Sequence, residues 1–170
     1  GSVEMEDGKV GNILEKHPSD RGMVNCGMYR LNDAIFKYLE KSGPSGRNEY
    51  ELTDGINLAI KDGIEFNAIE MEGWQTVSYP WDVLDANAKV LRENGSMISG
   101  SAKILPGAVI EEPVAIGDNA VIGPNCYIRK FSSIGAGCKV GNAVEIKNSV
   151  IMEKSNVSHL SYVGDSVIGR

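Results

Sequence analysis

The sequence predicts two folds in one chain: a mixed α/β segment up to about Gly95, followed by an all-β parallel β-helix. Two observations predict the second fold. After Gly95 an aliphatic residue recurs at every sixth position, and a small residue follows four positions after each of them. An α-helix cannot keep a period of six on one side, because its apolar stripe repeats every 3.6 residues. Before Gly95 this period is missing, and apolar runs alternate with helix-capping residues instead.

The α/β segment contains three predicted strands and three predicted helices. Asn32 and Thr53 are predicted to cap the first two helices, and Gly63 to end the second. Pro80 occupies the first turn of the third helix, which Gly95 closes. The predicted strands are residues 10–14, 23–29 and 64–69, and the predicted helices are residues 32–41, 53–62 and 80–94.

The repeat places one aliphatic and one small residue in each hexad, and each hexad is predicted to form one face of a triangular coil. Glycines directly follow the aliphatic residue at four hexads, where a tight corner needs a residue without a Cβ atom. The predicted inward residues are Ile98, Ile104, Ile110, Ile116, Ile122, Ile128, Ile134, Val140, Ile146 and Met152, then Val157, Val163 and Ile168 after a break in phase. The predicted small residues are Ala102, Ala108, Val114, Ala120, Cys126, Ser132, Cys138, Val144 and Val150.

Composition narrows the possible functions. The net charge is −6 and the seventeen Lys and Arg residues form no run, which argues against nucleic acid or a membrane surface as the main partner. Three cysteines without a CxxC pattern and no secretion signal predict reduced thiols and a cytoplasmic location. The two histidines show no metal-ligand spacing, so no zinc site is predicted. His17 is predicted to lie in a surface loop.

Two cations are predicted to lie side by side on the β-helix. If three hexads make one coil, residues eighteen apart stack about 4.8 Å apart, which places Arg129 beside Lys147. Two neighbouring cations repel each other unless an anion lies between them, and a phosphate suits an arginine fork and a lysine point charge. The alternative is a solvated face on which Glu111 or Glu145 neutralises the pair.

His159 is the histidine of the repeat segment, and it lies where the six-residue period breaks. Irregular segments on a rigid scaffold often carry function. An imidazole is a suitable base for removing a proton from an amine. The alternative interpretation is a surface histidine in a loop without a chemical role.

Several motifs resemble one family of bifunctional enzymes, the N-acetylglucosamine-1-phosphate uridylyltransferases/glucosamine-1-phosphate N-acetyltransferases. GNAVEIK (141–147) and HLSYVGD (159–165) resemble the acetyltransferase domain, a left-handed parallel β-helix. DGKV (7–10), ILEK (13–16), VNCG (24–27) and EYELTD (49–54) are similar to the end of the nucleotidyltransferase domain. YPWD (79–82) and LDAN (84–87) look most like the archaeal-type relatives. The resemblance therefore implies a nucleotidyltransferase remnant over residues 1–95 and an acyltransferase β-helix over residues 96–170.

In the β-helix, the resemblance assigns roles to four residues. Arg129 and Lys147 match residues that hold the phosphate of an amino-sugar phosphate, and Tyr162 matches a residue that contacts the sugar. His159 matches the base that deprotonates the amine before it attacks acetyl-CoA, the co-substrate. The resemblance implies a homotrimer, with sites shared between subunits.

In the first half, the resemblance implies that Glu15 and Asn25 bind the sugar of a nucleotide sugar and that Asp82 helps to hold Mg²⁺. The family's glycine-rich triphosphate loop has no counterpart here, and the chain stops in mid-repeat. We therefore expect an internal piece of a longer protein, without nucleotidyltransferase activity of its own. The contacts with acetyl-CoA are expected beyond residue 170.

The leading hypothesis is a transferase that acetylates an amino-sugar 1-phosphate and also makes a UDP-N-acetylglucosamine-type nucleotide sugar. A second hypothesis keeps the nucleotidylyltransferase as the only enzyme, with the β-helix as an oligomerisation module. A third makes the β-helix a regulatory module whose anion pocket senses a phosphorylated sugar. His159, Tyr162 and the two cations favour the first hypothesis, because a scaffold does not need them.

Overall fold

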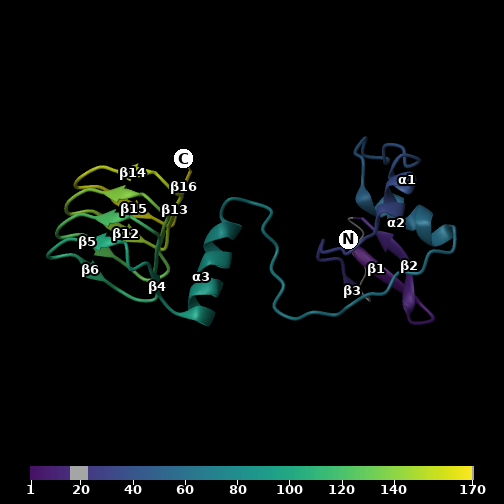
Figure 1. Cartoon of the computed structure of the whole chain (residues 1–170), viewed down its shortest axis with the longest axis horizontal. Coiled ribbons are helices and arrows are strands. Elements are labelled where there is room, and N and C mark those ends of the chain that lie inside the picture. Colours follow the sequence, from purple (N-terminus) through teal and green to yellow (C-terminus); the bar gives the residue numbers. More distant parts are fainter. Residues whose placement is uncertain (16–22, 170) are drawn as a thin grey trace. The chain divides into compact units, whose positions relative to one another are not determined.

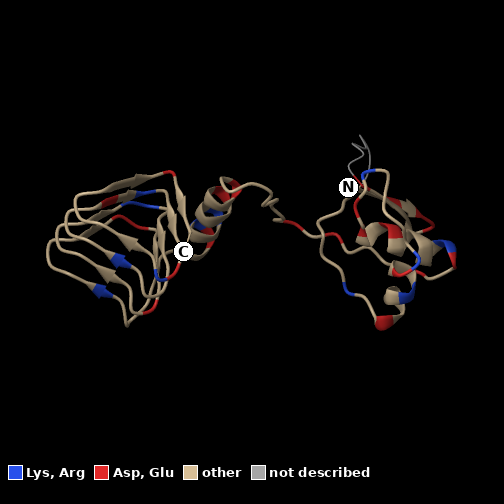
Figure 2. Ribbon diagram, turned by 90° about the horizontal axis from the view of Figure 1, so that it is seen from above, with Lys and Arg blue, Asp and Glu red and all other residues tan. Residues whose placement is uncertain are grey.

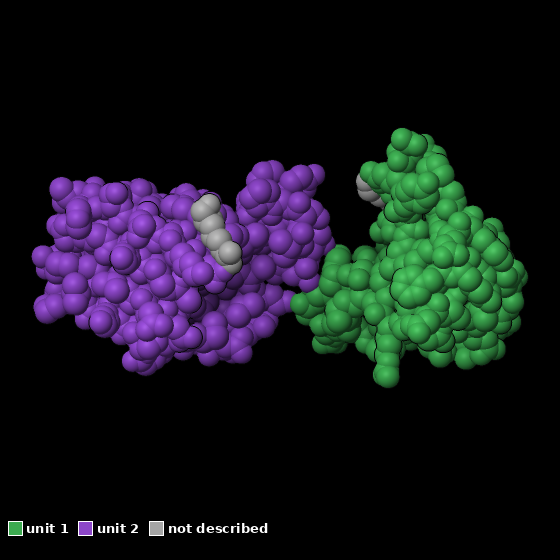
Figure 3. Space-filling model, turned by 45° about the horizontal axis from the view of Figure 1, so that its top comes forward, with its two compact units in different colours: residues 1–74 green, residues 75–170 purple. Residues whose placement is uncertain are grey.

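The computed structural model of the chain describes residues 1–15 and 23–169, so His17 lies outside the described residues. The chain divides into two compact units, Gly1–Trp74 and Gln75–Arg170, which Figure 3 draws in different colours. Within the described ranges, no helix has the length and apolar character needed to cross a membrane.

The first unit is a small antiparallel sheet with helices packed on it. The sheet has the order β2-β1-β3, and a cluster of buried residues, including Ile13 and Ile56, lies between it and the helices. Asn57 of the second helix joins the two layers, since its amide both donates to the Ile13 carbonyl and accepts from the Ile13 N–H. The elements are β1 (Ser2–Glu6), β2 (Lys9–Leu14), β3 (Met23–Val24), η1 (Asp33–Ile35), α1 (Phe36–Leu39) and α2 (Leu52–Lys61).

Most predicted elements of this unit are present, with three corrections. Asn32 caps the first helix as predicted, because its side chain accepts from the Ala34 N–H at 3.0 Å. Thr53 does not cap α2, which begins one residue earlier with Glu51 in the N-cap position. Residues 64–69, all within the described range, form no strand, because their backbone makes a single hydrogen bond to a strand, from the Val10 N–H to the Phe66 carbonyl.

The third correction concerns the strand predicted over residues 23–29. The observed strand, β3, is only two residues long. Gly27 has a φ of 77°, and its N–H donates to the side chain of Asn25 at 3.0 Å. This turn takes the backbone out of the extended conformation and ends the strand. Conversely, β1 was not predicted, since Glu4 and Glu6 give it no apolar run.

The second unit contains the predicted left-handed β-helix. Each coil contributes one strand to each of three parallel sheets, and the coils stack upon one another (Figure 1). The sheet orders are β16-β13-β10-β7-β4, β14-β11-β8-β5 and β15-β12-β9-β6. The strands are β4 (Met97–Ile98), β5 (Lys103–Ile104), β6 (Val109–Ile110), β7 (Ala115–Ile116), β8 (Val121–Ile122), β9 (Tyr127–Ile128), β10 (Ser133–Ile134), β11 (Lys139–Val140), β12 (Glu145–Lys147), β13 (Val150–Ile151), β14 (Asn156–Val157), β15 (Tyr162–Gly164) and β16 (Val167–Ile168).

The core of the coils is built from the two predicted series. Ile122, Ile128 and Ile146 are fully buried, and Cys126 and Cys138 fill the small positions between them. Ile98 and Ile104 are about 40% exposed because they belong to the first coil, which has a neighbouring coil on one side only.

The repeat loses one residue at two corners, after β12 and after β15, and one predicted inward residue is wrong. Ile134 pairs with Ile116, eighteen residues earlier, but with Ile151, seventeen residues later. Ile151 is therefore buried while Met152 is 42% exposed. Ser149 likewise takes the buried small position predicted for Val150, because the corner after β12 has one residue fewer. The later inward residues Val157, Val163 and Ile168 are in the predicted positions.

Helix α3 (Asp82–Asn94) belongs to the β-helix unit, although the sequence analysis assigned it to the first domain. Asn87 donates to the Phe131 carbonyl at 2.8 Å and accepts from the Ser133 hydroxyl, and the Arg92 guanidinium lies 4.6 Å from the Phe131 ring centroid. These contacts fix α3 to the sheet that contains β10 and β13. The units consequently divide after Trp74 and not after Gly95.

Candidate functional site

One face of the β-helix, formed by the sheet β15-β12-β9-β6, carries four of the predicted site residues at its strands and corners. Tyr127 pairs with Glu145, and the Arg129 N–H donates to the Ile146 carbonyl, so Arg129 and Lys147 occupy equivalent positions on adjacent strands. The predicted adjacency of the two cations is confirmed. The outward positions of the face are Val109, Tyr127, Glu145 and Tyr162 in one column, and Glu111, Arg129, Lys147 and Gly164 in the next.

Arg129 is held by two carboxylates. Its Nη1 donates to Glu145 Oε1 at 3.2 Å, and its Nε lies 3.6 Å from Glu111 Oε2. The hydrogen bond to Glu145 raises the pKa of Arg129 above its ordinary value. The Tyr127 hydroxyl donates to the same Glu111 oxygen at 3.1 Å, which raises the pKa of that phenol. The alternative in which Glu111 or Glu145 neutralises the cations is thus correct for Arg129.

Lys147 has a different partner, which the sequence analysis did not identify. Its Nζ lies 3.6 Å from Asp165 Oδ2, while the Asn148 amide donates to Asp165 Oδ1 at 2.7 Å. The hydrogen bond from Asn148, followed by the charge of Lys147, lowers the pKa of Asp165. The four charged side chains of the Arg129–Glu145 and Lys147–Asp165 pairs are all more than a third exposed, so water screens these interactions.

His159 and Tyr162 lie where this face begins. His159 is exposed at the corner between β14 and β15, and its Nδ1 accepts from the Asn142 backbone N–H at 2.8 Å. The Tyr162 ring folds back over Gly164, which pairs with Lys147. The imidazole thus lies at the corner from which the face starts, and the two cations lie at the other end of its strands.

A second candidate site lies in the first unit. Glu15 and Asn25 both line an open cavity of about 430 Å³, as the sequence analysis predicts for two residues of one sugar site. Arg47 lines it too, and its guanidinium is 2.7 Å from Glu51. Thr53, interpreted from the sequence as a helix cap, lines the same cavity with a buried hydroxyl that has no hydrogen-bond partner among the described residues.

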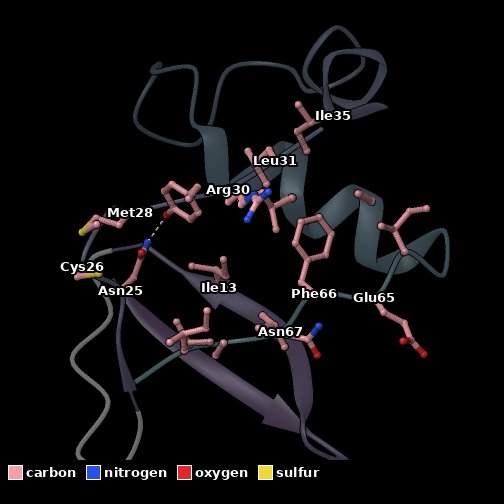
Figure 4. A pocket seen from close by; sticks show the side chains of 18 of the residues that line it. Ile13, Asn25, Cys26, Met28, Arg30, Leu31, Ile35, Glu65, Phe66 and Asn67 are labelled. Carbon is pink, nitrogen blue, oxygen red and sulfur yellow. Dashed lines mark hydrogen bonds between the residues drawn. The ribbon is translucent and has the colours of Figure 1, made fainter. Parts of the chain in front are cut away.

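Asn25 also lines a larger, mostly apolar cavity of about 670 Å³ (Figure 4). Ile13, Leu31 and Phe66 point into it from three different segments of the unit. The Asn25 amide donates to the Tyr29 hydroxyl at its edge, the dashed contact in Figure 4. Burial raises the pKa of Tyr29 despite this bond. Asn25 therefore stands between a polar and an apolar cavity.

Asp82 closes a turn in this structure. Its Oδ2 accepts from the N–H groups of Ser78 and Tyr79, both at 2.8 Å, just before helix α3. Among the residues that the structure describes, no group of three or more His, Cys, Asp or Glu side chains could hold a metal ion. The metal role of Asp82 stays a prediction from the resemblance alone.

The other charged residues that the structure describes form no large patch of one sign. Figure 2 shows acidic and basic positions interspersed over the coils and over the first unit. The anion-binding candidate is thus the local pair Arg129 and Lys147 rather than a broad basic surface.

Comparison with known proteins adds to this geometry. The chain is 43% identical to a bifunctional sugar-1-phosphate nucleotidylyltransferase/acetyltransferase of Sulfurisphaera tokodaii, over 94% of this chain and 44% of that protein. It is 40% identical to the bifunctional protein GlmU of Methanococcus vannielii and 37% identical to that of Methanocaldococcus jannaschii, each over 99% of this chain. This chain is homologous to the GlmU-type bifunctional proteins.

The homology to GlmU-type proteins covers both units of the chain, which spans about half the length of the curated relatives it matches. A family model described as the GMPPB C-terminal domain matches residues 110–170, which lie within the β-helix. The comparisons thus link the β-helix to sugar-1-phosphate nucleotidylyltransferases and to the acetyltransferases among them.

Proposed function

We propose that this chain is part of a bifunctional transferase that acetylates the amine of an amino-sugar 1-phosphate and makes a UDP-N-acetylhexosamine from a sugar 1-phosphate. One observation carries the proposal: Arg129 and Lys147 lie side by side on a face that begins at His159. The names of the relatives support both activities.

Phosphate binding on this face is a competition with the carboxylates already there. The ion pairs Arg129–Glu145 and Lys147–Asp165 are exposed, so water screens them and they hold the two cations only weakly. Hydrogen bonds from a charged donor to a phosphate contribute about 1.5–3 kcal/mol each. A sugar phosphate can therefore displace the carboxylates, with the Arg129 fork on two oxygens and the Lys147 ammonium on one.

The acetyl transfer is a direct attack of the sugar amine on the thioester carbonyl of acetyl-CoA. The C–N bond forms, the C–S bond breaks and the coenzyme leaves as a thiolate. The amine must lose a proton, and His159 is the group at this corner that can accept it; the thiolate is then protonated. Tyr162, whose ring lies beside Gly164, would contact the sugar between phosphate and amine.

The first unit would bind the sugar of the nucleotide sugar in the cavity lined by Glu15 and Asn25. A carboxylate and an amide suit sugar hydroxyls, which both donate and accept hydrogen bonds.

We also propose that the protein is a homotrimer, to be checked by light scattering of the full-length protein.

The test uses the full-length protein and glucosamine 1-phosphate. We expect thiol release from acetyl-CoA, and we expect His159→Ala to reduce its rate about 10²–10⁴-fold while nucleotidyl transfer is retained. His17→Ala, which removes the other histidine of this chain, serves as the control and should leave acetyl transfer unchanged. Acetylation by His159→Ala at a near wild-type rate would refute the role of His159.

The alternative, in which the β-helix only assembles the enzyme, is favoured by the carboxylates that hold both cations. It predicts nucleotide-sugar synthesis without any acetyl-CoA consumption. If the sugar phosphate instead bound the β-helix without being acetylated, the face would be a regulatory site. The thiol-release assay, combined with a binding measurement, separates the three outcomes.

A further inference from the structure

The corner that carries His159 is built from a ladder of equivalent positions on four successive coils. These positions are Pro106, Pro124, Asn142 and His159. The backbone bonds that stack them run from Asn125 N to Pro106 O at 3.3 Å, from Ala143 N to Pro124 O at 2.9 Å and from Leu160 N to Asn142 O at 3.0 Å. Proline has no backbone N–H. Asn142 is therefore the first member of the ladder that has a backbone N–H, and it lies on the coil next to His159.

That donor is used. The Asn142 N–H donates to His159 Nδ1 at 2.8 Å, a normal hydrogen-bond length. The neighbouring residue makes room for the ring, because a Cβ atom on Gly141 would lie 2.6 Å from His159 Nδ1 and 2.6 Å from His159 N. A side chain at position 141 would thus push the imidazole away from the Asn142 N–H.

We propose that Gly141 and the Asn142 N–H are the positioning elements of His159 and that they set the tautomer of its ring. A nitrogen that accepts a hydrogen bond carries no proton, so the neutral imidazole has its proton on Nε2. The ring then presents an N–H donor to a bound molecule. If His159 is the base of the acetyl transfer proposed above, the ring must leave the Asn142 N–H before Nδ1 can take the proton from the amine.

The decisive variant is Asn142→Pro, which removes the N–H from a corner that already holds proline at two equivalent positions, Pro106 and Pro124. Asn142→Ala is the matched control, because it loses the side chain and keeps the N–H. We expect Asn142→Ala to retain the wild-type ¹⁵N shifts of the His159 ring. In Asn142→Pro, we expect an increased population of the neutral form with its proton on Nδ1. Identical ring spectra in the two variants would overturn the proposal.

A second measurement does not depend on the proline variant folding. In the wild-type protein, a scalar coupling across the hydrogen bond should join the Asn142 amide nitrogen to His159 Nδ1. In His159→Gln, hydrogen exchange of the Asn142 amide should accelerate at least tenfold, while the Leu160 amide, bonded to the Asn142 carbonyl, stays protected. Absence of the coupling, or an unchanged exchange rate at Asn142, would contradict the positioning role.

These measurements test the positioning of His159 separately from the proposed acetyl transfer. A coupling and a tautomer shift without any acetyl transfer would refute the proposed reaction and leave the positioning of His159 intact. If acetyl transfer depended on His159 but the scalar coupling were absent, the proposed reaction would stand and the positioning of His159 by Asn142 would be refuted.

Discussion

Arg129 and Lys147 are neighbours on adjacent strands, yet each is paired with a carboxylate from a different strand or corner: Arg129 with Glu145 at 3.2 Å and Lys147 with Asp165 at 3.6 Å. Repulsion between the two cations is thereby offset without an anionic ligand. Because these side chains are 37–58% exposed, a ligand with higher charge can reach and replace the carboxylates. The resting face is thus compatible with phosphate binding but does not require it.

Replacing Arg129 tests whether the face binds a phosphate. In the full-length protein, Arg129→Gln should raise KM for the amino-sugar 1-phosphate about 10–100-fold, since charged hydrogen bonds contribute about 1.5–3 kcal/mol. The fall in kcat should be smaller, because Arg129 does not touch the amine. Steady-state thiol release at varied sugar phosphate measures both constants.

The control for this substitution is Lys139→Gln, which removes a cation from a different sheet of the β-helix. It should leave KM unchanged. Glu145→Gln should lower KM several-fold, because it removes the carboxylate that competes for Arg129. If Glu145→Gln raised KM as much as Arg129→Gln, the ion pair itself, rather than a free guanidinium, would be the binding element.

Asp165 gives a prediction on pH. The hydrogen bond from Asn148, with Lys147, holds the pKa of Asp165 below its ordinary 3.8. A carboxylate with a lowered pKa in the folded state contributes stability above the unfolded value, and this contribution is lost as pH falls through the folded value. Asn148→Ala should therefore raise the pKa of Asp165, measured by NMR titration of its carboxyl carbon. An unchanged pKa of Asp165 in Asn148→Ala would contradict the role of the Asn148 hydrogen bond.

The period of six predicted the β-helix and the neighbours Arg129 and Lys147, because parallel pairing of equal coils leaves no freedom in register. It could not locate the change to seventeen residues, since Ile151 and Met152 are both apolar and either satisfies the pattern. The Lys147–Asp165 pair and the Asn142–His159 hydrogen bond both depend on that change. These contacts therefore became visible only in three dimensions.

The first unit was less predictable, because its elements are short and tertiary contacts decide them. Residues 64–69 contain Ile64, Phe66 and Ala68 in alternation, the pattern of a strand, yet their backbone makes one hydrogen bond to β2, from the Val10 N–H to the Phe66 carbonyl. Thr53 resembles a helix cap in the sequence, but its hydroxyl is buried beside the cavity of Glu15 and bonds to none of the residues that the structure describes. Capping preferences in the sequence do not reveal such a position.

Alanine substitutions at two adjacent residues test the change of register. Ile151→Ala should destabilise the β-helix by about 2–5 kcal/mol, because it removes a fully buried side chain from the core. Met152→Ala should change stability by no more than about 1 kcal/mol, since Met152 is 42% exposed. Denaturant unfolding followed by circular dichroism compares the two. A larger loss of stability for Met152→Ala than for Ile151→Ala would contradict the change of register and support the regular eighteen-residue coil that the sequence predicts.

The corner glycines give a final prediction, on packing between coils. A Cβ atom on Gly135 would lie 2.5 Å from Glu153 N and 2.8 Å from Glu153 Cα, and these backbone atoms cannot move aside without shifting the next coil. We expect Gly135→Ala to cost about 1–3 kcal/mol and to lower Tm by about 2–12 °C. Gly100→Ala, at a corner of the first coil where a Cβ atom meets nothing within 4 Å, is the matched control and should leave Tm unchanged or slightly raised. Equal Tm values for the two variants would mean that the coils are not stacked as closely as the corner contacts require.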